Sequence, residues 1–156
     1  ENKLFYQGIR PAINAGLSVS RVGGSAQWKA MKQVAGTLRI SLANFRELES
    51  VVQFGSDLDT QSKRRLDRGR KTVEIMKQDV HELMSLPAQI VIFYALDKGY
   101  LDDLNINQIK NFMDEVDQGL YLNTIGKELN ELIEKEKAIT DTKLFDKFIN
   151  HVRRFI

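Results

Sequence analysis

The segment PAQIVIFYALDKG, residues 87–99, sets the fold class of this chain. Pro87 suits the first turn of a helix, because the N–H that proline lacks would have no intrahelical partner there. Residues 88–98 are apolar on nearly every face, which is typical of a helix in a protein interior. Gly99 favours the end of the helix. We therefore expect a buried central helix around which other helices pack.

Three further segments after this one have apolar residues at spacings of three and four. Residues at these spacings share one face of a helix, so each segment is predicted to be helical. The expected inward positions are Ile109, Phe112, Met113, Val116 and Leu120, then Ile125, Leu129, Leu132 and Ile133, then Leu144, Phe145, Phe148, Ile149, Val152 and Phe155. No strand pattern appears after Ser25. The bulk of the chain is therefore predicted to be a helical bundle.

Two helical patterns also precede the central segment. The first runs from Trp28 to Val52, with Ser25 as its amino-terminal cap. Gly36 lies inside this run, where a close helix contact would explain a glycine. Residues 54–59 interrupt the pattern, and a second helix is expected from about Thr60 to Gln78. Its expected inner face is formed by Leu58, Ser62, Leu66, Gly69, Val73 and Met76.

The first 25 residues have a different character. Short apolar runs are broken by Gly8, Pro11, Gly16, Gly23 and Gly24. The run Leu4-Phe5-Tyr6 favours the end of a strand, yet one strand alone is not stable in water. Because the chain also begins at Glu1 rather than at methionine, we expect a piece of a longer protein or a processed protein. The predicted class is mainly α, a helical bundle preceded by a strand and loop segment.

Size and composition narrow the possible functions. The chain has 156 residues, 42% hydrophobic and 28% charged, with a net charge of +2 and no cysteine. This length fits one domain with a short additional piece. Without cysteine there is no disulfide scaffold, thiolate metal site or cysteine nucleophile. The small net charge gives no global argument for nucleic acid, and no apolar run reaches the roughly 20 residues that span a bilayer.

Common catalytic motifs are missing. The two histidines, His81 and His151, lie far apart and form no helical metal-binding pair. The sequence contains no GxxxxGK[ST] phosphate loop and no GxSxG nucleophile motif. We therefore expect no free-standing active site, no metal site, and two solvated histidines.

A basic cluster allows two interpretations. It comprises Lys63, Arg64, Arg65, Arg68, Arg70 and Lys71, relieved by Asp67. Such a cluster either contacts a phosphate backbone or forms a solvated face that meets an acidic neighbour. No aromatic residues are interleaved for base stacking, which favours the solvated face. A free-standing helical nucleic-acid-binding module remains the alternative, and it predicts salt-sensitive binding that charge reversal at Arg64 and Arg65 abolishes.

Two arginines lie in the glycine-rich entry segment. Arg10 precedes Pro11, which favours an extended backbone at Arg10. Arg21 lies just before Gly23 and Gly24. A guanidinium held by a short, stiff loop can clamp a phosphate, because it is planar, always charged and offers forked donors. From the residues alone, an ordinary ion pair is an equally good interpretation for each.

Several segments resemble the alpha subunits of F-type ATP synthases. The longest is GIRPAINAGLSVSRVG, residues 8–23, followed by AMKQVAGTL, residues 30–38, and QFGSDLD, residues 53–59. Lys77-Gln78 and the run GYLD at residues 99–102 fall at similar intervals. The resemblance is dense to about residue 102 and thinner beyond it. Beta subunits share the fold but lack the SVSRVG signature, so the resemblance is specific to alpha.

This resemblance implies a fold and an assembly. Residues 1–25 would be the end of a nucleotide-binding domain with its arginine-finger loop, and residues 26–156 the carboxy-terminal helical domain. The implied partners are beta subunits, the gamma rotor and further alpha subunits, with no nucleic acid and no insertion into the membrane. The implied activity is ATP synthesis or hydrolysis coupled to proton transport, by the complex and not by this piece. The implied location is the periphery of an energy-coupling membrane, on the cytoplasmic side in bacteria or the matrix or stroma side in organelles.

The resemblance also implies roles for particular residues. Arg21 would be the arginine finger that acts in trans on a nucleotide bound by beta, with Ser20 beside it at the same interface. ATP or ADP with Mg²⁺ would be bound in the full complex, and none by this piece alone.

Two further groups of residues acquire implied roles. Arg10, Pro11 and Gln78 would contact the adenine of alpha's own non-catalytic nucleotide. Val80 stands where some family members have a second glutamine. The group that would face the gamma rotor consists of Ser56, Asp57 and Asp59.

Overall fold

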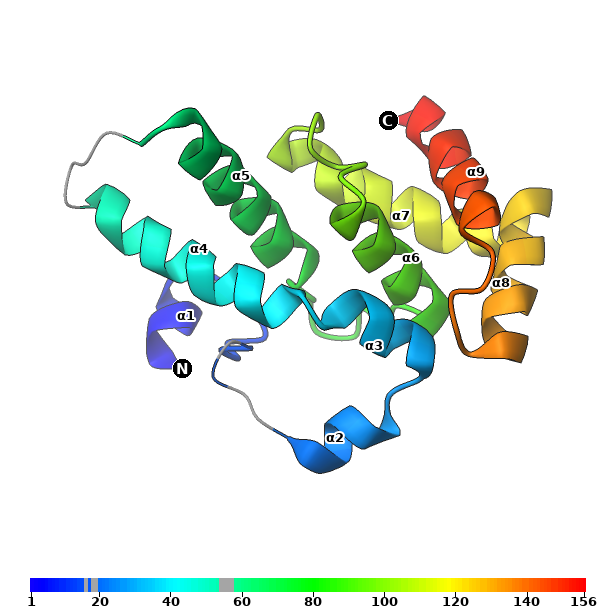
Figure 1. The fold of residues 1–156 in the computed structure, drawn as a ribbon, viewed down its shortest axis with the longest axis horizontal. Coiled ribbons are helices and arrows are strands. Elements are labelled where there is room, and N and C mark those ends of the chain that lie inside the picture. Colours follow the sequence, from blue (N-terminus) through cyan, green and yellow to red (C-terminus); the bar gives the residue numbers. More distant parts are fainter. Residues whose placement is uncertain (16, 18–19, 54–57) are drawn as a thin grey trace. The chain divides into compact units, whose positions relative to one another are not determined.

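The computed structural model describes residues 1–15, 17, 20–53 and 58–156, and every regular element in this described part is helical (Figure 1). The chain divides into two compact units. One comprises residues 1–19 and 36–82, and the other comprises residues 20–35 and 83–156. The predicted mainly helical class is confirmed. The unit of residues 1–19 and 36–82 is called the first unit below, and the unit of residues 20–35 and 83–156 the second unit.

The strand predicted at Leu4-Phe5-Tyr6 is wrong, because these residues belong to helix α1, Asn2–Tyr6. The backbone N–H of Phe5 donates to the carbonyl of Glu1 over 3.2 Å, and that of Gln7 donates to Lys3 over 3.1 Å. Leu4 is buried. Local helical hydrogen bonds thus satisfy a backbone that has no neighbouring strand to pair with.

Helix α6, Leu86–Asp97, confirms the prediction of a buried central helix in the second unit. Ser85 caps its start, since the Ser85 hydroxyl accepts a hydrogen bond from the N–H of Ala88, and Pro87 lies in the first turn. Gly99 follows the helix with φ of +82°, a left-handed conformation that costs glycine little. The buried residues of α6 are Pro87, Ala88, Ile90, Val91, Ile92, Tyr94, Ala95 and Leu96.

The three carboxy-terminal helices pack around α6 (Figure 1). They are α7, Ile106–Leu122, α8, Thr124–Glu136, and α9, Thr142–Val152, which continues into the short 3-10 helix η1, Arg153–Phe155. Asn105 and Gln108 form a capping box at the start of α7, and Asn123 caps α8. Phe155, expected inside, is exposed because it lies beyond the end of α9.

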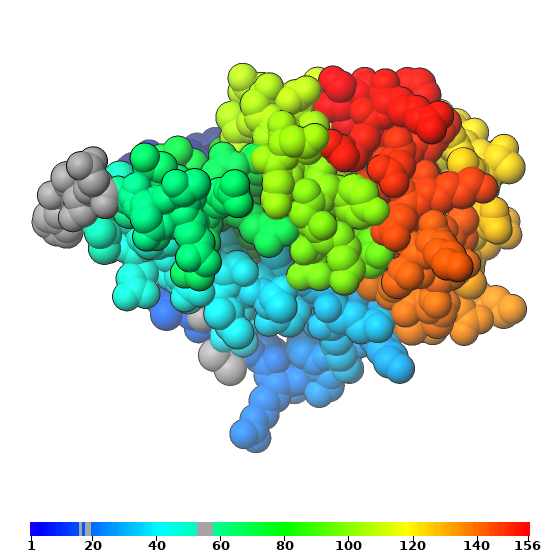
Figure 2. Space-filling model, turned by 45° about the horizontal axis from the view of Figure 1, so that its top comes forward, coloured from blue at the N-terminus to red at the C-terminus, as the bar shows by residue number. Residues whose placement is uncertain are grey.

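The carboxy-terminal turn lies beside the connection from α6 to α7 (Figure 2). Arg153 forms an ion pair with Asp103, and the side-chain amide of Gln108 donates to the carbonyl of Ile156 over 3.4 Å. These polar contacts tie the end of the chain to its own unit.

The single helix predicted from Ser25 to Val52 is wrong, since three helices occupy this region. They are α2, Arg21–Ala26, α3, Lys29–Ala35, and α4, Leu38–Gln53. Ser25 is not a cap but lies inside α2, where its hydroxyl donates to the carbonyl of Arg21 over 2.9 Å.

The break between α3 and α4 falls at an exposed turn, so Gly36 lies in a turn between two helices and not inside one helix as predicted. Helix α3 buries Ala30, Met31 and Val34 in the second unit, where it packs on α6. Helix α4 belongs to the first unit and packs on α5. Each half of the predicted helix therefore buries its apolar face in a different core.

Helix α5, Thr60–Ile75, ends three residues before the predicted Gln78. Its buried residues are Leu66, Gly69, Lys71, Thr72 and Ile75. The predicted inner positions Val73 and Met76 are therefore wrong, as Val73 is half-buried and Met76 is exposed. Gly69 explains the difference: a Cβ there would lie 2.3 Å from Cδ2 of Phe45, so α4 and α5 approach closely at this glycine.

Candidate functional site

Helix α2 presents Arg21 at the surface of the second unit. Ser20 precedes it in an extended conformation and caps the helix, because its hydroxyl accepts a hydrogen bond from the N–H of Gly23 over 3.0 Å. Arg21 is thus the first residue of the helix, and its side chain is exposed. Within the described part of the chain, the guanidinium has no hydrogen-bond or ion-pair partner. Its forked donors are available to an external anion.

Ser20 was predicted to flank a catalytic interface, and the structure assigns it a local task as a cap. The apolar pattern favoured Ser25 as the cap instead. The signal for Ser20 was present, since serine is favoured at this position. Gly23 and Gly24 made a helix after Ser20 look unfavourable, because glycine is a poor helix former.

The predicted nucleotide-contacting residues Arg10, Pro11 and Gln78 meet within the first unit. The backbone N–H of Gln78 donates to the carbonyl of Arg10 over 2.8 Å. The guanidinium carbon of Arg10 lies 4.9 Å from the ring centroid of Phe5, a cation–π contact. All three predicted residues are exposed. A guanidinium and a carboxamide at one surface can recognise a phosphate and the edge of a base, respectively.

The side chains near Gln78 complete this surface. The side-chain amide nitrogen of Gln78 donates to the carbonyl of Glu82 over 2.5 Å, so the amide oxygen is not used in this hydrogen bond and can act as an acceptor. Val80 is 83% exposed, and its apolar side chain offers no hydrogen bond.

Of the predicted rotor-facing residues, Ser56 and Asp57 lie outside the described residues. Asp59 caps α5, and its Oδ1 accepts a hydrogen bond from the N–H of Ser62 over 2.7 Å. This hydrogen bond is the main reason why the pKa of Asp59 is lowered, and attraction to Arg65 adds a smaller effect. The structure thus explains Asp59 as a helix cap, and its rotor-facing role stays a prediction.

The basic cluster on α5 is only partly a solvated face. Lys63, Arg64, Arg65 and Arg70 are exposed. Lys71 contradicts the prediction, since it is 2% exposed and its Nζ lies 2.7 Å from Oδ2 of Asp67. The ion pair offsets part of the cost of burying an ammonium group.

The two histidines differ. His81 is exposed, as predicted, with φ of +71°. The prediction of a solvated His151 is wrong, because its ring is half-buried between the side-chain amide of Asn123 and the edge of Phe155. Among the described residues, no group of three histidine, aspartate or glutamate side chains is placed to bind a metal ion. None of the described helices combines the length and the apolar character needed to cross a membrane.

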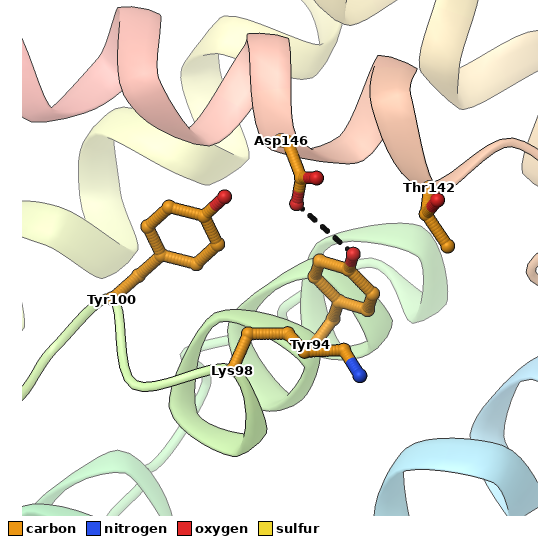
Figure 3. Close-up of a pocket in the computed structure, with 5 residues that line it drawn as sticks. All are labelled: Tyr94, Lys98, Tyr100, Thr142 and Asp146. Carbon is orange, nitrogen blue, oxygen red and sulfur yellow. Dashed lines mark hydrogen bonds between the residues drawn. The ribbon is translucent and has the colours of Figure 1, made fainter.

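A pocket of about 390 Å³ between α6 and α9 was not predicted (Figure 3). Tyr94, Lys98, Tyr100, Thr142 and Asp146 line it, and the Tyr94 hydroxyl donates to Oδ1 of Asp146 over 3.0 Å. Burial raises the pKa of Tyr94 and of Tyr100, and Asp146 raises both further. Both phenols therefore stay neutral near pH 7 and are not activated as nucleophiles. The hydrogen bond from Tyr94 to Asp146 instead connects α6 with α9.

No local pattern could have identified this pocket, because Tyr94 and Asp146 are separated by 52 positions. A buried tyrosine indicates that its hydroxyl has a partner, but the sequence does not say which one.

Residues 27–155 match the family described as "ATP synthase alpha/beta chain, C terminal domain". The ATP synthase subunit alpha of Acholeplasma laidlawii (strain PG-8A) is 73% identical over 156 residues, which cover 100% of this chain and 31% of that protein. The ATP synthase subunit alpha of Staphylococcus aureus (strain JH9) is 50% identical over 154 residues, 99% of this chain and 30% of that protein.

The chain thus spans 31% and 30% of the lengths of these two curated relatives. The resemblance to alpha subunits is confirmed over the whole chain, including the part beyond residue 102 where the motifs are thin. These relatives give no support to the alternative of a nucleic-acid-binding module.

Proposed function

Because this chain belongs to the family of ATP synthase alpha and beta chains, as its carboxy-terminal domain, we propose that it acts in the catalytic head of a rotary ATP synthase as part of an alpha subunit. The curated relatives that match it along its whole length are named as alpha subunits. In this proposal the complex synthesises or hydrolyses ATP and couples this to proton transport. It does so at the periphery of an energy-coupling membrane, on the cytoplasmic side in bacteria.

The central element of the proposal is that Arg21 acts in trans on a catalytic site of the beta subunit. The supporting observation is its exposed guanidinium on the first residue of α2, without a partner in the described part of the chain. A positive charge there would stabilise the negative charge that develops on the transferred phosphoryl group. In related phosphoryl-transfer enzymes such an arginine contributes about a thousandfold or more to the rate.

Substitution of Arg21 by lysine tests this role. Lysine keeps the charge but loses the planar fork of donors, so we expect steady-state ATP hydrolysis by the assembled head to fall by about a hundredfold or more. The fold should be unchanged, since among the described residues no hydrogen bond or ion pair involves the Arg21 side chain.

Arg39→Lys is a matched control, because Arg39 is also exposed. The assembled head with Arg39→Lys should hydrolyse ATP at the wild-type rate. A wild-type rate for the Arg21→Lys head would refute the finger role.

A second element concerns Arg10, Pro11 and Gln78, which we propose contact the adenine of a non-catalytic nucleotide, ATP or ADP with Mg²⁺. Their convergence through the hydrogen bond from Gln78 to Arg10 supports this proposal. Gln78→Ala removes the side-chain amide and with it the acceptor oxygen. The affinity of the non-catalytic sites for ATP should then fall about tenfold, which corresponds to one lost hydrogen bond. Equilibrium binding of a fluorescent ATP analogue to the assembled head measures this, and an unchanged affinity would exclude the contact.

The remaining partners follow from the same assembly. We propose that beta subunits, the gamma rotor and other alpha subunits contact this chain, and that the region of Ser56, Asp57 and Asp59 faces gamma. Cysteine cross-linking from position 59 to gamma checks the last assignment, which fails if cross-links form with other subunits alone.

A further inference from the structure

We infer that Lys32 is a positioning residue for Arg21, an inference that rests on the proposed finger role. The observation behind it concerns the way α2 is held. All six residues of α2 are exposed, so no buried side chain fixes this helix. Figure 1 shows α2 set apart from helices α6 to α9 and joined to them through α3. Its orientation must therefore come from polar contacts.

In the described part of the chain, one side-chain hydrogen bond links α2 to a neighbouring helix. The Lys32 ammonium donates to the carbonyl of Ser25 over 3.2 Å, across seven positions of sequence. Ser25 lies in the last turn of α2, where carbonyl groups have no partner within the helix. A cation there is favourable for the same reason.

The contact continues from Ser25 to Arg21. The Ser25 hydroxyl donates to the carbonyl of Arg21, and Ser20 caps the opposite end of the helix. Because these hydrogen bonds connect the two ends of a six-residue helix, we expect a shift at Ser25 to move Arg21 with it. Lys32 acts on the guanidinium through the backbone and does not touch the nucleotide.

The helix that carries Lys32 is itself firmly anchored. The N–H of Ala30 donates to the carbonyl of Lys137 over 2.8 Å, and the Gln33 side-chain oxygen accepts from the N–H of Ile139 over 3.0 Å. The Lys137 ammonium also lies 5.5 Å from the ring centroid of Trp28. Helix α3 is therefore held in place by the connection between α8 and α9. The hydrogen bond from Lys32 to Ser25 in turn fixes α2 relative to α3.

The test measures ATP hydrolysis by the assembled head with Lys32→Met, Lys32→Arg and Lys29→Met. Misplacement of a catalytic group by about 1 Å can cost up to a hundredfold in rate, so we expect Lys32→Met to lower kcat between about threefold and thirtyfold. The KM for ATP should stay unchanged, because the finger acts in the transition state. Lys32→Arg should restore most of the rate. Lys29 is an exposed lysine on the same helix, so Lys29→Met should have no effect.

A double-variant experiment separates positioning from a general structural role. In the Arg21→Lys background, Lys32→Met should have no further effect, because there is no finger left to position. A further loss in that background, an equal loss in Lys29→Met, or a wild-type kcat for Lys32→Met would each overturn the inference.

The same variants distinguish the inference from the proposal beneath it. If Arg21→Lys slows turnover and Lys32→Met does not, the positioning role fails and the finger role stands. If Arg21→Lys has no effect, both fail. Should Lys32→Met prevent assembly, Lys32→Gln compared with Lys32→Arg decides in the same way.

Discussion

The two units bury their apolar residues to different degrees. In the second unit, the interior contains large side chains with no exposed surface, among them Phe112, Phe145 and Phe148. The first unit buries fewer apolar side chains, namely Leu4, Leu42, Phe45, Leu66 and Ile75, together with the polar Lys71 and Thr72. Its exposed large apolar side chains include Phe5, Tyr6, Ile13, Leu17, Ile40, Val51, Met76 and Val80.

This difference in burial predicts which unit has the larger free energy of unfolding. Burial of apolar surface is the main favourable term in folding, so the second unit should resist unfolding more strongly. Segments with few buried contacts open more easily. The candidate nucleotide residues lie in the first unit, whereas Arg21 lies on an exposed helix of the second. Both candidate sites are therefore carried by weakly buried segments, and four substitutions test the comparison.

The largest effect is expected for Gly126→Ala in the second unit. A Cβ at this position would lie 2.0 Å from the backbone oxygen of Gly119, and the backbone of α7 cannot rotate away as a side chain can. We expect the free energy of unfolding to fall by more than about 3 kcal/mol in urea titrations followed by circular dichroism.

Gly24→Ala is the control, because a Cβ there meets no atom within 4 Å. It should leave stability unchanged or raise it slightly. A loss below about 1 kcal/mol for Gly126→Ala would show that the contact of α7 and α8 is looser than described.

A smaller effect is expected for Gly69→Ala in the first unit. The added Cβ would lie 2.3 Å from Cδ2 of Phe45, a side chain that can move only with α4. We expect a loss of about 1–3 kcal/mol, part of which Phe45→Leu should restore.

Amide hydrogen exchange shows whether the units respond separately. Helices α4 and α5 should lose protection in the Gly69→Ala chain, while α6 to α9 retain it. Equal loss of protection in both units would mean that they unfold together, and the comparison would fail.

Alkaline pH tests the pocket of the second unit. The raised pKa of Tyr94 means that the unfolded chain releases this proton near pH 10.0 while the folded chain retains it. Stability should therefore be complete below pH 10 and fall as the pH rises further. Tyr94→Phe should flatten this decline in Tm between pH 9 and 11, at a cost of about 1 kcal/mol near neutral pH. Tyr121→Phe, at an exposed position, should keep the wild-type decline, and the same decline in Tyr94→Phe would contradict the assignment.

The smallest effect is expected for Asp59→Ala, which removes the exposed cap of α5. Since the pKa of Asp59 is lowered in the folded chain, its contribution is present above the unfolded value of 3.8 and is lost as the pH falls through the lower folded value. The NMR shift of the Ser62 amide should report this titration. Asp59→Asn keeps an acceptor oxygen and should retain the hydrogen bond at all pH values. A Ser62 shift that is unaffected by Asp59→Ala would exclude the cap.

The structure confirms several of the expectations that depend on local chemistry. The central helix, with its proline in the first turn and Gly99 at its end, follows from residues within a few positions of one another. The inward faces of the last three helices largely follow from apolar spacing, although Met113, Ile125 and Leu132 are only half-buried and Phe155, beyond the last turn, is exposed. The strand at residues 4–6 and the cap at Ser25 failed because short segments carry too little periodic signal to choose between structures.

The candidate site divides in the same way. Family motifs in the sequence indicated Arg10, Arg21 and Gln78 as site residues, but they did not show which of these residues are in contact. The hydrogen bonds from Gln78 to Arg10 and from Lys32 to Ser25 depend on how separate segments of the chain come together, and no pattern of residue types encodes such a contact.

The sequence by itself determined a helical fold and the family to which the chain belongs, because periodicity, caps and motifs are local in the chain. Only the tertiary structure decided that α3 and α4 contribute to different cores, that Lys71 is buried, and that Tyr94 contacts Asp146. Each of these depends on free-energy differences between packing arrangements of distant segments. Such differences are set by which surfaces fit together, so they appear only once the chain has folded.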